Sequence, residues 1–369
     1  MWIHEHQNWP NFTWDAEALA SKLADIRYRQ GRLLGRMEGL GFALKREASL
    51  NTLTNDVLKS SAIEGETLNP EEVRSSIARR LGIDMAGLIP ASRDVEGIVE
   101  MMLDATQQFS KPLTELRLCN WHAALFPTGR SGMQRITVGE WRTSDAGPMQ
   151  VVSGPAGKEK VHFEAPHADL LKKEMRVFLE WFGNEQDIDP VLKAGIAHLW
   201  FVTIHPFEDG NGRIARAVGD MALARADNTQ DRFYSLSSQI EAERKDYYDH
   251  LEKQQCSTPD ITNWLVWFLD CLGRAISSAE TTLGNVLFKA QLWDTVNQMP
   301  VNDRQRLIIN RMLEDDFRGH INTSKYAKLA KCSNDTALRD IQDLKDREIL
   351  IQNPGGGRST SYRLTNRVE

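Results

Sequence analysis

The chain has 369 residues, 41% of them hydrophobic, with 45 lysines and arginines against 51 aspartates and glutamates and a formal net charge of -6. This composition is typical of a globular protein of two or three domains, and it excludes disordered, collagen-like and disulfide-scaffold classes. The four cysteines form no C-x-x-C pair, so neither a zinc ribbon nor a disulfide framework is expected. The apolar stretches fall short of the roughly 18 residues of a membrane span, and MWIHEHQNWPNF lacks the pattern of a secretory signal, so we expect a cytoplasmic protein without membrane contact.

The amino-terminal part of the chain is predicted to be helical. Over residues 15–59 apolar side chains recur at every third or fourth position, with a break near residues 39–41. The run NPEE at 69–72 combines a capping residue, a proline at the first helical position and an acidic first turn, which predicts a helix to about residue 81. We therefore expect an amino-terminal helical domain over residues 1–105.

The pattern changes over residues 139–166, where GEWRTS and MQVVSG are short, β-prone and separated by the turn-forming run DAGP. This predicts a β-hairpin. Helical patterns follow over residues 190–204, 213–225, 241–251 and 261–276. We assign residues 106–285 to a central helical core that carries the hairpin.

After Pro300 the pattern is three helices followed by a hairpin, which is the order of a winged helix-turn-helix, expected over residues 286–369. Ser333 is expected to cap its recognition helix and to leave Asn334, Thr336 and Arg339 exposed. Residues 322–367 contain nine lysines and arginines against five aspartates and glutamates. Arginines on the expected wing, Arg358 and Arg363, suit DNA phosphates, whereas aspartates on or beside the recognition helix oppose DNA, so docking to a protein stays an alternative.

The most informative segment is HPFEDGNGRIAR, residues 205–216, which separates two helical patterns. Gly210 and Gly212 permit positive φ angles, so the second helix is expected to begin at them. Arg213 and Arg216 then lie on one face of its first turn, where cations oppose the helix dipole. A bound polyphosphate would compensate the charge of both arginines and accept hydrogen bonds from the free N–H groups of the turn.

Two further side chains of this loop suit phosphate chemistry. The Asp209 carboxylate would repel bound phosphates unless a cation bridged them, which indicates Mg²⁺. His205 can accept a proton near neutral pH. Two other interpretations exist: D-G-N-G is a common turn, and Gly210-x-Gly212-x-x-Ala215 fits a dinucleotide fingerprint with Asp231 downstream. The fingerprint requires a preceding strand, where this sequence predicts a helix.

The same segment resembles the signature of the Fic family, H-P-F-x-[DE]-G-N-G-R-x-x-R, with every specified position filled. The resemblance implies a mainly α fold, a helical core with a β-hairpin flap, and transfer of AMP from ATP to a hydroxyl of a target protein or of the chain itself. It implies a site made of His205 as the base, Asp209 as the Mg²⁺ ligand, Gly210, Asn211 and Gly212 as the anion hole with Arg213 assisting, Arg216 on the γ-phosphate and Tyr248 beside the adenine.

A second resemblance concerns SSAIEG, residues 60–65, which is similar to the inhibitory motif [ST]-x-x-x-E-[GN] of Fic proteins whose inhibitory helix precedes the core. It implies that Ser60 and Glu64 form a brake, in which the Glu64 carboxylate pairs with Arg216 where the γ-phosphate binds. Alternatives on the same fold are removal of AMP and other nucleotidyl or phosphoryl transfer. An alternative from a different functional class is a DNA-binding regulator whose nucleotide site is a sensor. A homodimer is compatible with the enzyme and with the regulator.

Overall fold

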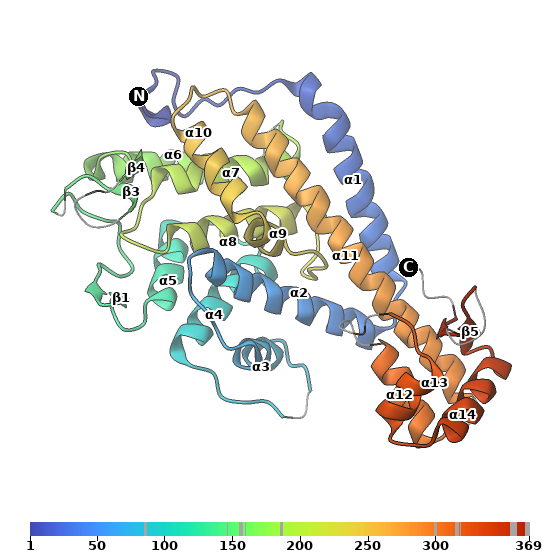
Figure 1. Ribbon diagram of the computed structural model, residues 1–369. Coiled ribbons are helices and arrows are strands. Elements are labelled where there is room, and N and C mark those ends of the chain that lie inside the picture. The colour runs from blue at the N-terminus through green and yellow to red at the C-terminus, as the bar shows by residue number, and fades with distance from the viewer. Residues whose placement is uncertain are drawn as a thin grey trace. The chain divides into compact units, whose positions relative to one another are not determined.

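Helices form most of the chain, which the computed structural model describes over residues 1–84, 87–145, 147–154, 158, 160–184, 187–298, 301–313, 317, 319–354 and 360–365. The chain divides into two compact units, Met1–Ala279 and Glu280–Glu369 (Figure 1). The segments predicted as an amino-terminal domain and as a core lie together in the first unit, because their helices pack against one another.

The helices of the first unit are α1 (Ala16–Glu38), α2 (Phe42–Ile63), α3 (Pro70–Arg80), α4 (Arg93–Gln107), α5 (Glu115–Leu125), α6 (Leu171–Gly183), α7 (Pro190–Ile204), α8 (Asn211–Asp227), α9 (Leu236–Ala242), α10 (Arg244–Gln255) and the first part of α11 (Thr262–Asn297), with short 3₁₀ turns at Ile3–Glu5 and Ala168–Leu170.

Capping side chains begin several of these helices at the predicted residues. The Asn69 side chain accepts a hydrogen bond from the Glu71 N–H at 2.9 Å, and Pro70 follows it as the first helical residue. The Asp189 side chain likewise accepts a hydrogen bond from the Val191 N–H at 2.7 Å, and Pro190 is the first residue of α7. These local interactions confirm both predicted helix starts.

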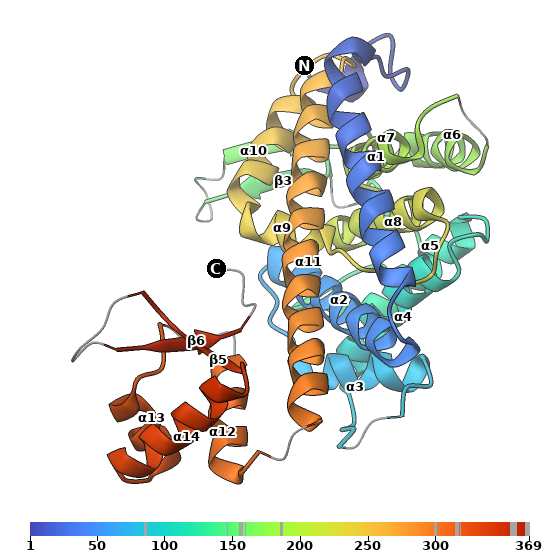
Figure 2. The same cartoon turned by 90° about the vertical axis from the view of Figure 1, so that its right-hand side faces the viewer.

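Two buried helices form the centre of the first unit. Helix α7 is buried over nearly its whole length, and it packs lengthwise against α8. Helix α2 packs against α9 and the near end of α8, and α1 lies beside the first part of α11 (Figure 2). Gly195 of α7 permits the contact with α11, because a Cβ atom there would lie 2.9 Å from the Phe268 ring. The loop between α7 and α8 is consequently held between two rigid elements.

The hairpin differs from the prediction in its first strand. The antiparallel pair is β3 (Gln150–Ser153) with β4 (Lys160–Glu164), interrupted by a bulge between Val151 and Val152. GEWRTS is not a strand, because Arg142 within it is buried and bound instead to the α7–α8 loop, where its backbone N–H donates to the Pro206 carbonyl at 2.9 Å. A second, very short pair joins β1 (Arg130–Ser131) to β2 (Gln134–Arg135).

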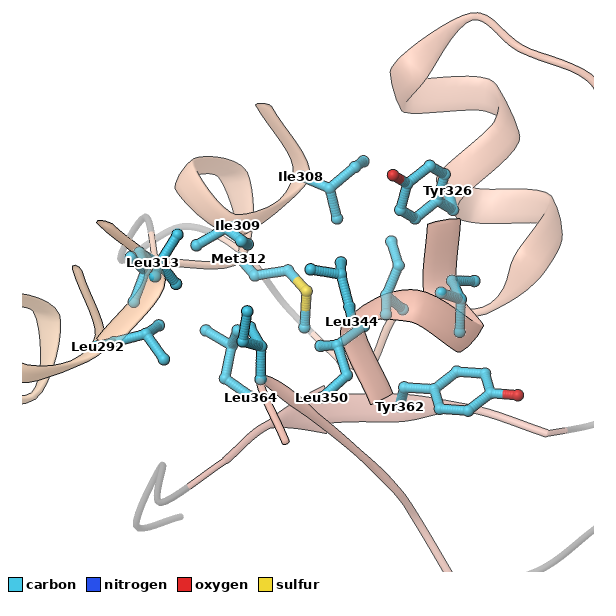
Figure 3. Close-up of a cluster of buried hydrophobic side chains, with 14 of the residues drawn as sticks. Leu292, Ile308, Ile309, Met312, Leu313, Tyr326, Leu344, Leu350, Tyr362 and Leu364 are labelled. Carbon is cyan, nitrogen blue, oxygen red and sulfur yellow. The ribbon is translucent and has the colours of Figure 1, made fainter. Parts of the chain in front are cut away.

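The second unit contains the end of α11, then α12 (Asp303–Leu313), α13 (Thr323–Ala330), α14 (Asn334–Asp346), β5 (Leu350–Gln352) and β6 (Tyr362–Leu364). Strands β5 and β6 are antiparallel, and a further bridge joins Ile321 to Tyr362. Their apolar side chains meet those of the helices in one core, with Met312 and Leu344 near its centre (Figure 3). Arg358 lies outside the described residues.

Candidate active site

The loop between α7 and α8 turns sharply at both ends. His205 ends α7 in the left-handed region with φ 52°, and Gly210 precedes α8 with φ 78°. Glycine adopts that angle readily, and a Cβ atom at residue 210 would also lie 2.9 Å from the Phe126 ring. The structure therefore requires glycine at this position and starts α8 at Asn211, as the sequence indicated.

The interior of the loop is fixed by Asn211. Its side-chain carbonyl accepts from the Phe207 N–H at 3.0 Å, and its amide donates to the Phe207 carbonyl at 2.8 Å. Phe207 is fully buried and stacks on His122 with ring centroids 4.2 Å apart. These contacts give the loop one conformation, so its backbone N–H groups and the His205 ring keep fixed positions.

His205 is oriented as a base. Its Nδ1 lies 3.2 Å from the Val202 carbonyl, which can only accept, so Nδ1 carries the proton and Nε2 presents the lone pair. Burial, together with the nearby Arg142, lowers the pKa of His205 to about 4, against the opposing effects of the Val202 carbonyl and of Asp209 and Glu64. The Arg142 Nε also donates to the His205 carbonyl at 2.8 Å. At neutral pH the ring is therefore uncharged and able to accept a proton.

The start of α8 lies against the Glu64 carboxylate. A Cβ atom added at Gly212 would lie 2.2 Å from Glu64 Oε1 and 3.2 Å from Arg216 Nη1. The carboxylate thus occupies the point at which the free N–H groups of the helix and the Arg216 guanidinium converge. Such a point attracts anions, because the helix dipole and the guanidinium act together.

Arg216 is buried and held from α2. Its Nε donates to Ser60 Oγ at 2.9 Å, and its Nη2 donates to the Ser60 carbonyl and to Glu64 Oε1, each at 2.8 Å. Gly65, with φ 86°, ends α2 in a Schellman turn in which the Glu66 N–H bonds to the Ser61 carbonyl. This turn places Glu64 at the mouth of the site.

Arg213 is held by a second acidic residue of the same turn. Its Nη1 lies 2.6 Å from Glu66 Oε2, and its guanidinium lies 5.1 Å from the centre of the Phe126 ring. Glu66 was not predicted as a site residue, although it lies only two positions beyond Glu64. Both arginines expected to bind phosphate are therefore paired with carboxylates in this structure.

Asp209 accepts two hydrogen bonds. One of its carboxylate oxygens accepts from Ser131 Oγ, and the other accepts from the Gly210 N–H at 2.5 Å. Among the described residues no three histidine, cysteine, aspartate or glutamate side chains gather in a metal-binding group. An ion that arrives with a nucleotide fits this donor set, since Mg²⁺ commonly binds one or two protein carboxylates together with substrate phosphates.

A cavity of about 490 Å³, within the usual size of small-molecule sites, lies beside the start of α8. His205, Gly212, Glu64 and Tyr248 are among the residues that line it. Tyr248 is 38% exposed, and its hydroxyl lies 3.5 Å from Glu64 Oε2. Strands β3 and β4 form a further wall, so the hairpin and the loop face the same space.

The structure thus brings all the predicted site residues into one region, from α2, the α7–α8 loop, α8 and α10. Sequence reasoning missed Glu66, Arg142 and Ser131. Arg142 and Ser131 contact the loop across more than 60 residues of sequence, and no local pattern around them indicates such a contact. The helix before the loop also excludes the dinucleotide fingerprint, which requires a strand there.

A neutral histidine and a helix start line one cavity, and two buried arginines follow on the first turns of α8, an arrangement that suits an anionic ligand. The family comparison agrees with this class. Residues 112–223 match the model of the Fic/DOC family, and residues 2–83 match a domain of unknown function, DUF4172. The match to the Fic/DOC family model covers the part of the chain that contains the α7–α8 loop.

The curated relatives are named as adenylyltransferases. The chain is 32% identical over 122 residues to protein adenylyltransferase Fic of Nematostella vectensis, covering 32% of this chain and 27% of that protein. It is 27% identical over 248 residues to protein adenylyltransferase Fic of Aedes aegypti, covering 66% of this chain and 44% of that protein. The matches therefore span less than half the length of these relatives.

A solved structure gives the fold over most of the chain. The crystal structure of a Fic family protein from Desulfovibrio desulfuricans G20 aligns with a TM-score of 0.50 and 22% identity, covering 95% of this chain and 97% of that one. This likeness shows a mainly helical Fic fold. Within the described residues no helix is both long and apolar enough to cross a membrane.

Proposed function

We propose that this chain is a protein adenylyltransferase that moves AMP from ATP to a hydroxyl of a target protein. One observation carries the proposal: a neutral His205, with its Nε2 lone pair free of the Val202 contact, lines the same cavity as the start of α8. The names of the curated relatives support the same chemistry.

In the proposed reaction the target hydroxyl gives its proton to His205 Nε2, and its oxygen forms a bond to the α-phosphorus. The bond from that phosphorus to the pyrophosphate oxygen breaks, and pyrophosphate leaves with the electron pair. Asn211 and Gly212 present backbone N–H groups to the charge that develops on the phosphate oxygens, and Gly210 does so once its N–H leaves the Asp209 carboxylate. Tyr248, at the cavity wall, offers a ring on which the adenine can stack.

Asp209 is the residue that would hold Mg²⁺, which when bound supplies positive charge to the phosphate oxygens. To do so Asp209 gives up the hydrogen bond from Ser131. The two arginines complete the phosphate site once their carboxylate partners leave, with Arg216 assigned to the γ-phosphate and Arg213 to its neighbour.

We further propose that Glu64 inhibits the enzyme in this conformation. Its carboxylate lies where the γ-phosphate would contact Arg216, and like charges repel at this distance. ATP therefore binds unproductively or weakly until the carboxylate moves away. Glu66 acts in the same way on Arg213, with less effect because its side chain is 46% exposed.

The test is to incubate a cell lysate with Mg²⁺ and ATP plus the Glu64→Gly variant, and to analyse the proteins by mass spectrometry. An AMP adduct on serine, threonine or tyrosine, absent with Glu64→Gly/His205→Ala, is expected. A phosphate adduct would instead indicate phosphoryl transfer. Loss of AMP from a previously adenylylated protein on incubation with wild type would indicate removal, the other reaction considered for this fold.

A second proposal concerns the second unit, whose order of helices and strands supports a winged helix that binds DNA. Two aspartates of α14 that oppose this function are used internally: Asp340 pairs with Arg304 at 2.8 Å, and Asp343 pairs with Arg347 at 2.9 Å. Asn334 and Arg339 are exposed on the same helix. A salt-dependent gel shift of duplex DNA is expected from the full chain, and no shift at low salt would contradict DNA binding.

The exposed surface of α14 departs from the prediction at one position. Thr336 is half-buried, because its N–H donates to the capping Ser333 hydroxyl at 3.2 Å. Leu338 on the same helix is 51% exposed. A cytoplasmic location and a homodimer stay predictions from the sequence.

A further inference from the structure

A short hairpin beside Asp209 carries positive charge that the proposed reaction does not use. Strands β1 and β2 pair with Arg130 directly opposite Arg135, so the two side chains leave the same face of the pair. Both arginines are exposed, and Met133 at the turn between them is 92% exposed. This hairpin projects from the helices of the first unit near α5 (Figure 1). We call residues 130–135 the arginine hairpin.

The chain does not neutralise the two charges itself. Arg130 Nη1 donates to the Met133 carbonyl at 3.0 Å, and within the described residues neither Arg130 nor Arg135 forms an ion pair. Residues 127–138 contain these two arginines and no lysine, aspartate or glutamate, although the whole chain has a net charge of -6. Because like charges directly opposite each other destabilise a strand pair, an anion bound at this face would stabilise the hairpin.

Contacts with the α7–α8 loop hold the arginine hairpin in place despite this repulsion. Ser131 Oγ donates to the Asp209 carboxylate. Just beyond the hairpin, the Thr137 N–H and hydroxyl donate to the Glu208 carboxylate at 3.1 and 2.8 Å, and these bonds do not depend on Asp209. The arginine hairpin is therefore tied to the loop that begins at His205, and a protein segment bound at His205 comes within reach of its side chains.

The chemistry of this surface suits a protein better than the nucleotide. Neither arginine of the hairpin lines the cavity proposed for ATP, whose phosphates are already assigned to Arg213 and Arg216. Arginine and methionine are enriched in protein interfaces, whereas lysine and acidic residues are depleted, and the sequence RSGMQR has this composition. A guanidinium group binds a carboxylate through two parallel hydrogen bonds, so acidic side chains are the complementary partner.

We propose that the arginine hairpin docks an acidic segment of the target protein beside the hydroxyl that receives AMP; this inference rests on the proposed adenylyltransferase function. Carboxylates of the target pair with Arg130 and Arg135, and an apolar side chain of the target packs on Met133. The arginine hairpin thus selects targets by charge. It affects the binding of the target protein and leaves the binding of ATP unchanged.

The experiment compares the Glu64→Gly chain with the same chain carrying Arg130→Glu and Arg135→Glu, each incubated with lysate, Mg²⁺ and ATP labelled at the α-phosphate. We expect the charge reversal to lower the label on lysate proteins about tenfold at low salt, and the difference to shrink at high salt. Replacement of both arginines by lysine keeps the charge and should lower the label no more than about threefold.

A matched control reverses the charge of two exposed arginines elsewhere on the first unit. Arg36→Glu with Arg176→Glu, on α1 and α6, makes the same change in net charge and should leave the label on lysate proteins unchanged.

Two binding measurements separate docking from damage to the nucleotide site. With a non-hydrolysable ATP analogue and Mg²⁺ present, a fluorescent octaglutamate peptide should bind the Glu64→Gly chain about tenfold more tightly than the chain with both arginines reversed. Titration calorimetry with the analogue and Mg²⁺ should give equal affinities for the two chains.

Two results would overturn the inference and leave the proposed function standing. The first is labelling of lysate proteins that survives the reversal of Arg130 and Arg135. The second is a parallel loss of affinity for the ATP analogue, which would assign both arginines to the nucleotide. If the Glu64→Gly chain labels no protein, the inference and the proposed function both fail.

Discussion

The two acidic residues at the end of α2 should inhibit nucleotide binding to different degrees. Both Glu64 and Glu66 pair with an arginine of α8, at 2.8 and 2.6 Å. The arginines are similarly buried, 1% exposed for Arg216 and 6% for Arg213, but Glu64 is 31% exposed and Glu66 is 46% exposed. The shorter distance alone would predict the larger effect on nucleotide binding for Glu66, whereas burial and position predict the larger effect for Glu64.

The magnitudes follow from this difference. A hydrogen bond to a buried charged group contributes about 1.5–3 kcal/mol, so Glu64→Ala should tighten ATP binding about 10- to 150-fold. An ion pair with an exposed partner contributes about 0.2–1 kcal/mol, so Glu66→Ala should tighten it about 1.5- to 5-fold. Salt screens the exposed pair more strongly, so the effect of Glu66→Ala should shrink at high salt.

Titration calorimetry with a non-hydrolysable ATP analogue and Mg²⁺, at low and high salt, measures both effects. The control is Glu71→Ala, an exposed glutamate at the start of α3 that lies outside the cavity lining. Equal gains from Glu64→Ala and Glu66→Ala, or a larger gain from Glu66→Ala, would refute the ranking by burial. Unchanged affinity in both variants would refute inhibition by these carboxylates.

Two further predictions concern the loop. Because burial lowers the pKa of His205 to about 4, the base is neutral above that pH, so the rate of the Glu64→Gly variant should stay level from pH 8 to 6 as far as His205 is concerned; a loss centred near 6.5 would contradict this. Asn211→Ala removes both hydrogen bonds to Phe207 within a buried loop and should lower the free energy of unfolding by about 2–3 kcal/mol; a thermal unfolding midpoint equal to that of wild type would contradict the proposed role of Asn211.

Much of this architecture was predictable because it is local. Asn69 and Asp189 each cap a helix from a position two residues away, and Gly210 adopts a backbone angle that follows from its residue type. The hairpin was assigned the wrong first strand because Arg142 is bound across the fold to the His205 carbonyl, and pattern reasoning detects alternation along a strand but not such a contact. The predicted helix at 241–251 is similarly divided at Glu243.

The same difference between local and distant contacts decided which site residues could be predicted. The loop residues are adjacent in sequence and could be named, whereas Glu66 and Ser131 come to it from other segments. In the same cavity His162 on β4 contacts Glu252 on α10, 90 residues further along the sequence. No pattern in the sequence predicts this contact.

The central claim is that this site transfers AMP covalently and that Glu64 holds it back. The most direct measurement follows the label from α-labelled and γ-labelled ATP into protein, in lysate with Mg²⁺, for wild type, Glu64→Gly and His205→Ala. We predict protein-bound α-label that rises strongly in the Glu64 variant, vanishes in the His205 variant and has no γ-labelled counterpart. Absence of α-label with all three proteins, or equal labelling by wild type and Glu64→Gly, would contradict the account.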